Sequence, residues 1–230
     1  MMPSPIPELE FSRKYDQQHA ESYFRKHRQG ISRRLSNLRE IQIARKALHL
    51  AGNPATVLDL PCGAGRFWPM LLEQPERALL AADNSQHMLD VALTRQPTEI
   101  TRRVTTFQSS AFAIELPDAA VDCLFCMRLL HHIGDAQHRL AMLREFHRVT
   151  RDTLIVSLWV DGNYKAWKRK KLETTRFRSE GDHANQNRFV IAKTTIETEF
   201  RQAGFHIVGH FDFLPGYAMW RVYTLRKTGA

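Results

Sequence analysis

The chain has 230 residues, 43% of them hydrophobic, which is enough to bury one well-formed core, and no apolar run approaches the ~18 residues of a membrane-spanning helix. Three cysteines are too few for a disulfide framework, and no secretory signal is visible, so we expect a cytoplasmic protein. The formal net charge of +9, from 33 basic against 24 acidic residues, predicts an anionic partner.

The pattern is helical from about residue 15 to residue 50, where apolar residues recur at spacings of three and four. Gly30 is expected to separate two helices, and Gly52-Asn53-Pro54 to end the second. We therefore expect an N-terminal helical segment over residues 1–50, followed by a domain over residues 51–230.

The stretch from Thr56 to Phe67 predicts a buried strand that ends on Asp59 and turns sharply into a helix. Gly63 and Gly65 let the backbone of the turn adopt conformations that a Cβ forbids, and let a ligand approach closely. A helix that begins just after the turn points free N–H groups at such a ligand. A dinucleotide-binding turn needs a third glycine, and Trp68 occupies that position, so the nucleotide fingerprint fails.

The segment Val57-Leu58-Asp59-Leu60-Pro61-Cys62-Gly63-Ala64-Gly65 resembles motif I of the class I S-adenosylmethionine-dependent methyltransferases, with Pro61 in place of the motif's first glycine. Residues 50–160 resemble the family well, and resemble most its small-molecule branch, which includes the ubiquinone/menaquinone-type enzymes. The resemblance implies S-adenosylmethionine as cofactor. It also implies a three-layer, Rossmann-like α/β fold, with a seven-stranded, mostly parallel sheet and a reversed last strand.

In the resembled family, N-terminal helices lie across the cofactor pocket as a lid. Helices that merely cover one side of the sheet are an equal alternative for this chain. If the lid forms, Tyr15, Tyr23 and Phe24 are the candidates to touch substrate.

A second buried strand, Ala78–Ala82, ends at Asp83, at about the spacing where an acid meets a ribose. The stretch that follows resembles the family's Asp-x-Ser-x-x-Met-Leu segment, which implies that Asp83 binds both ribose hydroxyls. Helix capping is the alternative, and suits Asn84 and Ser85 better. The expected cofactor-binding residues are Asp59, Pro61, Cys62, Gly63, Gly65, Asp83, Asn84, Met88, Ser109, Ser110, Ala111 and Arg128.

Ser109 follows a third expected strand, Val104–Gln108, at a position where the family often has an acid that contacts adenine. Either the Ser109 hydroxyl with the following backbone, or the Gln108 side chain, is expected to make that contact here.

A fourth strand, Val121–Met127, leads to His131 and His132, at the sheet edge where ligands bind in open α/β folds. A neutral imidazole there could take a proton from a hydroxyl nucleophile, but the pair also recurs in the resembled branch where the chemistry differs. General base and pocket-shaping roles both stay open. Cys123 and Cys126 in the same strand point to opposite faces, so we expect packing and no metal site.

Thr194 to Glu197 predicts a capping box for a later helix. The other expected elements are a helix over Asp135–Val149, a fifth strand over Thr153–Val160 entered by a turn without glycine, a helix that ends at Gly204, and strands over Phe205–Phe211 and Tyr217–Leu225.

A basic insertion is expected between residues 161 and 193, with aromatic residues among its cations. Its basic residues are Lys165, Lys168, Arg169, Lys170, Lys171, Arg176, Arg178, Arg188 and Lys193. Cations and aromatics together suit an anionic or nucleobase-bearing substrate, with Tyr164, Trp167, Lys168 and Arg169 as candidate substrate residues. A solvated helix followed by a loop is the alternative.

The resemblance implies methyl transfer by direct displacement from a sulfonium, which needs alignment of the reactants and no metal or covalent nucleophile. The expected acceptor is a small molecule or an anionic glycan or lipid headgroup. Two alternatives stay open: an RNA methyltransferase that uses the basic insertion, and an inactive cofactor-binding scaffold for a protein partner. Contact with a membrane surface is compatible with the basic charge, and the sequence does not predict an oligomeric state.

Overall fold

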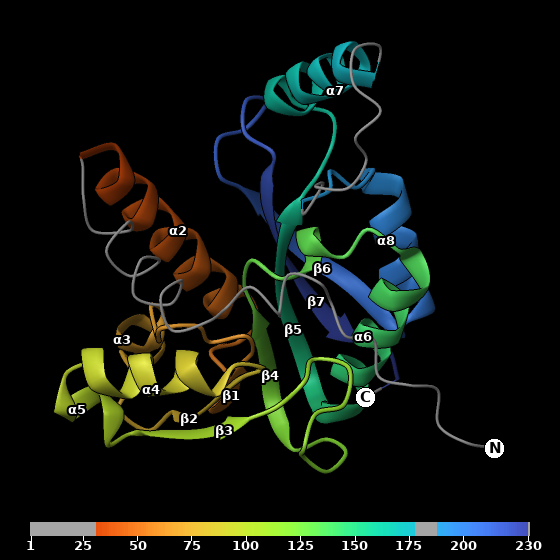
Figure 1. Cartoon of the computed structure of the whole chain (residues 1–230). Coiled ribbons are helices and arrows are strands. Elements are labelled where there is room, and N and C mark those ends of the chain that lie inside the picture. The colour runs from red at the N-terminus through yellow and green to blue at the C-terminus, as the bar shows by residue number, and fades with distance from the viewer. Residues whose placement is uncertain (1–30, 178–187, 230) are drawn as a thin grey trace.

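The computed structural model describes residues 31–177 and 188–229. They form one seven-stranded sheet in the order β3-β2-β1-β4-β5-β7-β6 (Figure 1). The strands are Thr56–Asp59 (β1), Ala78–Asp83 (β2), Val104–Gln108 (β3), Val121–Cys126 (β4), Thr150–Trp159 (β5), Phe205–Asp212 (β6) and Trp220–Lys227 (β7). β7 pairs antiparallel with β5 and β6, and the other pairs are parallel, so the predicted fold is confirmed.

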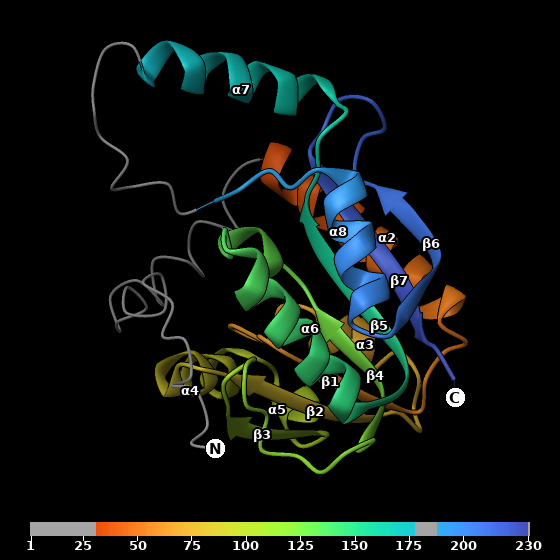
Figure 2. The same cartoon turned by 90° about the vertical axis from the view of Figure 1, so that its right-hand side faces the viewer.

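Helices cover both faces of the sheet, which gives three layers (Figures 1 and 2). Buried residues of α2, α3 and α4 pack on one face, and those of α6 and α8 pack on the other. The described helices are Ile31–Leu50 (α2), Trp68–Leu71 (α3), Gln86–Arg95 (α4), Thr98–Thr101 (α5), Leu130–His132 (the 3-10 helix η2), Ala136–Val149 (α6), Tyr164–Phe177 (α7) and Lys193–Gln202 (α8).

Each strand contributes side chains to both cores, because successive strand side chains point to opposite faces of the sheet. In β4, Cys123 belongs to the core under α2 and α3, whereas Cys126 belongs to the core under α6 and α8. Both thiols are free and completely buried, which confirms that this pair packs in the two cores.

The predicted capping box at Thr194 is wrong. The N-cap of α8 is Ala192, which makes no side-chain capping bond. Asp161 takes over the capping role, since its Oδ1 accepts a hydrogen bond from the backbone N–H of Lys193 at 3.0 Å. Glu197, the other half of the expected box, instead accepts a hydrogen bond from the Tyr223 hydroxyl at 3.0 Å.

Other boundaries also differ from prediction, and β7, expected over Tyr217–Leu225, is Trp220–Lys227. The helix expected just after the turn that follows Asp59 is short, Trp68–Leu71, and Pro69 in its first turn has no N–H to donate. β5 begins at Thr150, which is also the C-cap of α6, so helix and strand join without a glycine turn.

The second half of α2 covers the sheet, because Ile43, Ala44, Ala47 and Leu48 are buried in the core. The first half extends beyond it, and Leu35 and Leu38 are each 62% exposed. The alternative of a covering helix therefore describes the second half of α2. The expected lid aromatics Tyr15, Tyr23 and Phe24 lie outside the described residues.

The helix α7 projects from the end of the molecule where β5 finishes (Figures 1 and 2). Its first turn is held by the loop between β6 and β7, since Tyr164 N–H donates to Gly216 O at 2.9 Å and Lys165 N–H to Tyr217 O at 3.0 Å. Among the described residues, no helix is both long and apolar enough to cross a membrane.

Candidate functional site

The turn after β1 is shaped by two glycines in the left-handed region, Gly63 at φ +54° and Gly65 at φ +67°. A Cβ on Gly65 would lie 2.7 Å from the buried Trp68 ring, so no larger residue fits there without displacing that ring. A Cβ on Gly63 would face Met88, 3.6 Å away. Cys62 is buried beside them, and Pro61 is half-buried.

Asp83, at the end of β2, is tied to this turn. Its Oδ2 accepts the backbone N–H of Gly63 at 2.9 Å, and its Oδ1 accepts the N–H of Ser85 at 3.0 Å. Burial raises the pKa of Asp83, while these backbone bonds act in the opposite direction. The Ser85 side chain does not cap α4, so the carboxylate of Asp83 organises the start of that helix.

Asp59 is the buried acid of the site. Both of its carboxyl oxygens are buried without a hydrogen-bond partner among the described residues. Burial, and then the neighbouring charge of Asp83, raise the pKa of Asp59 well above its usual range, while the nearby Trp68 indole and Arg66 act weakly in the opposite direction. An uncompensated buried carboxyl is costly, and a cation bound beside it would stabilise its ionised form.

The expected adenine contacts lie next to Asp83. Ser109 N–H donates to the backbone oxygen of Asp83 at 3.0 Å, and Ser109 Oγ accepts the N–H of Glu115 at 3.2 Å. Gln108 donates to the backbone oxygen of the exposed Asn84 at 2.9 Å. Ser110 and Ala111 follow in a half-buried loop. The structure therefore gathers the residues from the ends of β1, β2 and β3.

Arg128 lies on another side of the site, after β4. Its backbone has φ +66°, and its N–H donates to Ser157 Oγ at 2.8 Å. Its guanidinium pairs with Glu40 of α2, which also pairs with Arg66 of the motif I turn. Burial alone would raise the pKa of Glu40, but the two arginines outweigh it and lower that pKa. Glu40 thus ties α2 to the edge of the sheet.

His131 is buried in an aromatic cluster where β4 and β5 end and β7 begins. Its ring stacks on Trp159 with centroids 5.0 Å apart, and meets the Trp220 ring edge-on at 4.7 Å. Burial, followed by the nearby cationic side chains, lowers the pKa of His131 from 6.5 to about 2. An imidazole that stays neutral to such low pH is a weak base, so this location favours a pocket-shaping role. His132 is half-buried beside it, with ring centroids 4.1 Å apart.

Two cations approach Trp159. The guanidinium of Arg169, from α7, lies 5.1 Å from its ring centroid, and that of Arg188 lies 5.8 Å away. Arg169 also donates to the backbone oxygen of Arg188 at 2.9 Å. The structure brings Arg169 to the aromatic cluster, whereas the other three candidates from the basic insertion are exposed on α7: Tyr164, Trp167 and Lys168.

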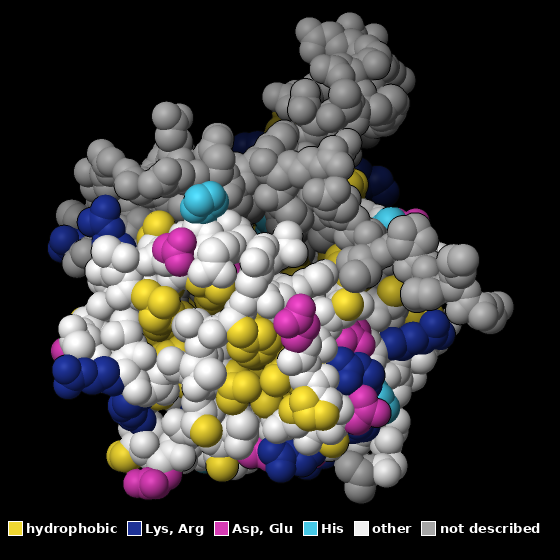
Figure 3. Space-filling model, turned by 60° about the horizontal axis from the view of Figure 1, so that its bottom comes forward, with side chains coloured by type: hydrophobic (Ala, Val, Ile, Leu, Met, Phe, Trp, Pro, Cys, Tyr) yellow, Lys and Arg dark blue, Asp and Glu magenta, His cyan; other side chains and the backbone are white. Residues whose placement is uncertain are grey.

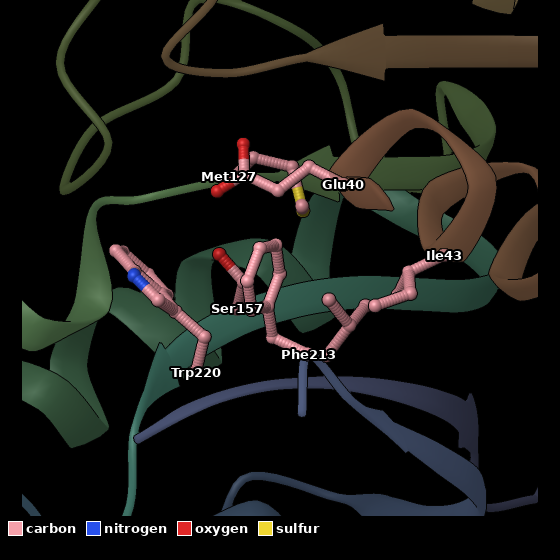
Figure 4. A pocket seen from close by; sticks show the side chains of 7 residues that line it. Glu40, Ile43, Met127, Ser157, Phe213 and Trp220 are labelled. Atoms are coloured by element: carbon pink, nitrogen blue, oxygen red, sulfur yellow. The ribbon is translucent and has the colours of Figure 1, made fainter. Parts of the chain in front are cut away.

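A pocket opens between α2 and the sheet, next to the aromatic cluster (Figure 4). Its empty space is ≈ 250 Å³, including part of its open mouth, and it is lined by Glu40, Ile43, Met127, Ser157, Phe213, Trp220 and Val222. Trp220 is shared by the pocket and the cluster around His131. Because that space includes open solvent, the enclosed part of the pocket is far smaller than the ~300–1,000 Å³ of common ligand sites.

The loop that carries the histidines is held by a buried ion pair. Arg139 of α6 binds Glu199 of α8 through two hydrogen bonds, of 2.8 and 2.6 Å. Its remaining Nη1 donates to the backbone oxygens of Ile133 and Gly134. Arg139 therefore fixes the backbone immediately after His132. Among the described residues, no group of His, Cys, Asp and Glu could hold a metal ion.

Sequence reasoning did not single out Glu40, Trp159 or Trp220 as site residues. Trp159 ends β5, and the rule that ligands gather at the carboxyl ends of strands could have found it. Trp220 comes opposite Trp159 only through the antiparallel pairing of β5 and β7. The arginine partners of Glu40 lie 26 and 88 residues away in sequence, beyond any local pattern.

Comparisons with known proteins point to one family. Residues 57–153 match the profile of the family described as "Methyltransferase domain". The chain is 26% identical over 134 residues to the tRNA (carboxymethyluridine(34)-5-O)-methyltransferase ALKBH8 of Macaca fascicularis, which covers 57% of this chain and 18% of that protein. It is 30% identical over 95 residues to an uncharacterized methyltransferase of Schizosaccharomyces pombe, covering 41% of this chain and 34% of the relative. Its matches thus span about a third or less of these relatives' lengths.

Solved structures share the whole fold at low identity. Magnesium protoporphyrin IX methyltransferase of Synechocystis PCC 6803, with bound SAH, aligns with a TM-score of 0.73 and 14% identity over 96% of this chain and 100% of its own. The 1,6-didemethyltoxoflavin-N1-methyltransferase of Burkholderia thailandensis aligns with a TM-score of 0.65 and 19% identity, over 99% of this chain and 93% of its own. At such identities the likeness concerns the fold.

Proposed function

This chain carries a class I methyltransferase domain whose cofactor is S-adenosylmethionine, and on that premise we propose that it methylates an anionic acceptor. The acceptor is a small molecule, or a glycan or lipid headgroup, bound where β4 and β5 end and β7 begins. The feature that supports this choice is the aromatic cluster of His131, Trp159 and Trp220, with Arg169 and Arg188 beside Trp159. A planar or anionic molecule gains both stacking and charge complementarity from such a cluster.

The residues at the ends of β1 and β2 fit the cofactor. Asp83 would hold the ribose hydroxyls, because carboxylate oxygens that already accept one backbone N–H each retain a further lone pair. The Gly63 and Gly65 turn leaves room for a ligand, and the unpartnered carboxyl of Asp59 suits a cationic one. When bound, S-adenosylmethionine supplies a methyl group on a positively charged sulfonium, and the sulfur leaves as a neutral thioether when a nucleophile takes the methyl group.

The chain's own contribution is alignment and the exclusion of water. Holding two reactants in line is worth up to ~7–11 kcal/mol of the barrier, so no covalent nucleophile is required. An acceptor that is already anionic at the reacting atom needs no base, which agrees with a His131 that stays neutral and buried. Glu40 holds α2 against this edge through Arg66 and Arg128, and so limits access to the pocket.

The resemblance of the motif I segment to the small-molecule branch supports such an acceptor. The direct test is methyl labelling of a cell extract that has been separated into small molecules, lipids, glycans, RNA and protein. We expect label from S-adenosylmethionine in a small-molecule, lipid or glycan fraction that an anion exchanger retains. Label in the neutral fraction, or in none, would refute the proposal.

A second candidate is RNA methylation, which is supported by the similarity to a tRNA methyltransferase and by the excess of cations. In that case the label would enter the RNA fraction. RNA binding would also weaken steeply with salt, because phosphate contacts release counterions.

A further inference from the structure

Five large apolar side chains are exposed at one end of the molecule, and we call them the outer patch. They are Tyr164, Trp167 and Leu172 of α7, with Leu214 and Tyr217 of the β6–β7 loop. Between 46% and 60% of each side chain is exposed. Exposed apolar groups that cluster in this way mark an interaction surface more often than scattered ones do.

The three aromatic rings of the outer patch lie next to one another. The rings of Tyr164 and Tyr217 stack with centroids 5.7 Å apart and planes 12° apart, and Trp167 lies 6.0 Å from Tyr164. The backbone bonds from Tyr164 and Lys165 to the loop hold the two elements together. The helix itself begins on a side-chain cap, since Asn163 Oδ1 accepts the N–H of Ala166 at 2.9 Å.

Four exposed lysines surround this patch: Lys165, Lys168, Lys170 and Lys171. Lys165 Nζ lies 5.2 Å from the Tyr217 ring, and Lys171 Nζ lies 5.6 Å from the Trp167 ring. The stretch from Gly162 to Leu172 contains no acid. Aromatic, aliphatic and cationic groups are therefore exposed together at this end of the molecule.

The patch stands out from the body of the protein, because α7 projects beyond the sheet in both views (Figures 1 and 2). On the face at the other end of the molecule, acidic and basic side chains are interspersed (Figure 3). The face in Figure 3 therefore lacks the concentration of one charge that the described part of α7 has.

We propose that the outer patch docks the protein on the surface of an anionic lipid bilayer. Trp and Tyr prefer the headgroup level, Leu gains from the acyl boundary, and Lys attracts anionic headgroups while its stem lies along apolar surface. The protein would lie on the bilayer and not cross it.

A nucleic acid fits this face less well. Leu172 and Leu214 have no ring on which a base can stack, yet they are 55% and 46% exposed. The cations around the patch are lysines, which act as point charges, whereas planar two-pronged recognition of phosphate is the property of arginine. Arg169, the arginine in this part of α7, is directed to Trp159 instead.

Docking would bring the sheet edge to the bilayer. Arg169 of α7 contacts the Trp159 ring at the end of β5, while Trp167 and Lys171 of the same helix belong to the exposed face. One helix therefore links the outer patch to the aromatic cluster.

The test is flotation of the full chain with vesicles of phosphatidylcholine alone, or of equal parts phosphatidylcholine and phosphatidylglycerol. We expect binding to the anionic vesicles only, and its loss with rising salt. Replacing Lys165, Lys168, Lys170 and Lys171 by Gln should lower partitioning by roughly 600-fold, at about fivefold for each Lys. The matched control replaces four distant exposed cations: Lys46, Arg102, Arg144 and Arg201.

Trp167→Ala distinguishes docking through the outer patch from non-specific adsorption of a basic protein to anionic vesicles. It should lower partitioning about tenfold at unchanged charge, and circular dichroism verifies that it is folded. Equal partitioning of the lysine variant and its control, or no effect of Trp167→Ala, would overturn the proposal. So would binding to a uridine oligomer that is tighter than to anionic vesicles and is lost in the lysine variant.

Discussion

The backbone N–H of Gly63 donates a hydrogen bond of 2.9 Å to Oδ2 of Asp83, across 20 residues of sequence. This bond joins the turn after β1 to the acid at the end of β2. The two parts of the expected cofactor site are therefore one unit, in which the carboxylate is oriented before any ligand arrives. Preorganisation of this kind lowers the ordering that binding requires.

Asp59→Asn should stabilise the free protein and weaken cofactor binding. The raised pKa of Asp59 means that the unfolded chain ionises this group near pH 3.8, whereas the folded chain keeps it protonated to a higher pH. The free energy of unfolding of the native protein is therefore lowered progressively as the pH rises above 3.8 toward the folded-state pKa. Asn does not titrate. The free energy of unfolding of the variant should therefore exceed that of the native protein by an amount that grows over this pH window and then levels off.

Urea unfolding between pH 5 and pH 8, with calorimetry of S-adenosylmethionine, measures both effects. A variant that is less stable than the native protein throughout would show that Asp59 has a partner in the fold.

His131→Phe should change how stability depends on pH. The unfolded chain takes up a proton on His131 near pH 6.5, whereas the folded chain does so only at about 2. The native protein therefore loses stability as the pH falls below 6.5, and Phe keeps the ring without this loss. Between pH 7.5 and 5.5, the native protein should lose more stability than the variant does, on the order of 1 kcal/mol.

Urea unfolding at the two pH values measures this difference. Equal losses would mean that His131 titrates normally in the fold, and would reopen its role as a general base.

The sequence predicts the elements that local patterns encode. The apolar run before Asp59, the glycines after it and the run before Asp83 are each local, and the sheet they predict is present. The aromatic cluster depends on pairings that no local pattern contains, such as Trp159 opposite Trp220. The start of α8 was misplaced for a similar reason, because its cap comes from Asp161, 32 residues upstream of Lys193.

Glu199→Ala should destabilise the fold by about 3–5 kcal/mol, because it leaves the buried guanidinium of Arg139 without its carboxylate. The matched control is Glu73→Ala, which breaks the exposed pair with Arg45 and should cost no more than about 1 kcal/mol. Urea unfolding of both variants gives the comparison. Similar costs would show that Arg139 finds other partners and does not anchor the loop after His132.

Arg169→Gln with Arg188→Gln should raise KM for the anionic acceptor by about 10- to 100-fold, because a charge-assisted contact contributes ~1.5–3 kcal/mol. Cofactor affinity should not change, since both side chains lie against Trp159, away from Asp83. The control with the same loss of charge is Lys168→Gln with Lys170→Gln, on exposed positions of α7. Equal effects of the two double variants on KM would show that the arginines act only through the net charge of the protein.

Calorimetry of the native protein and of Asp83→Ala with S-adenosylmethionine tests the central claim most directly, with Asp90→Ala as an exposed control on α4. We expect the native protein and the control to bind alike, and Asp83→Ala to lose ~1–3 kcal/mol, the usual cost of removing a charge-assisted hydrogen-bonding group. NADH should bind more weakly than S-adenosylmethionine. Unchanged affinity in a folded Asp83→Ala protein, or tighter binding of NADH, would contradict the account.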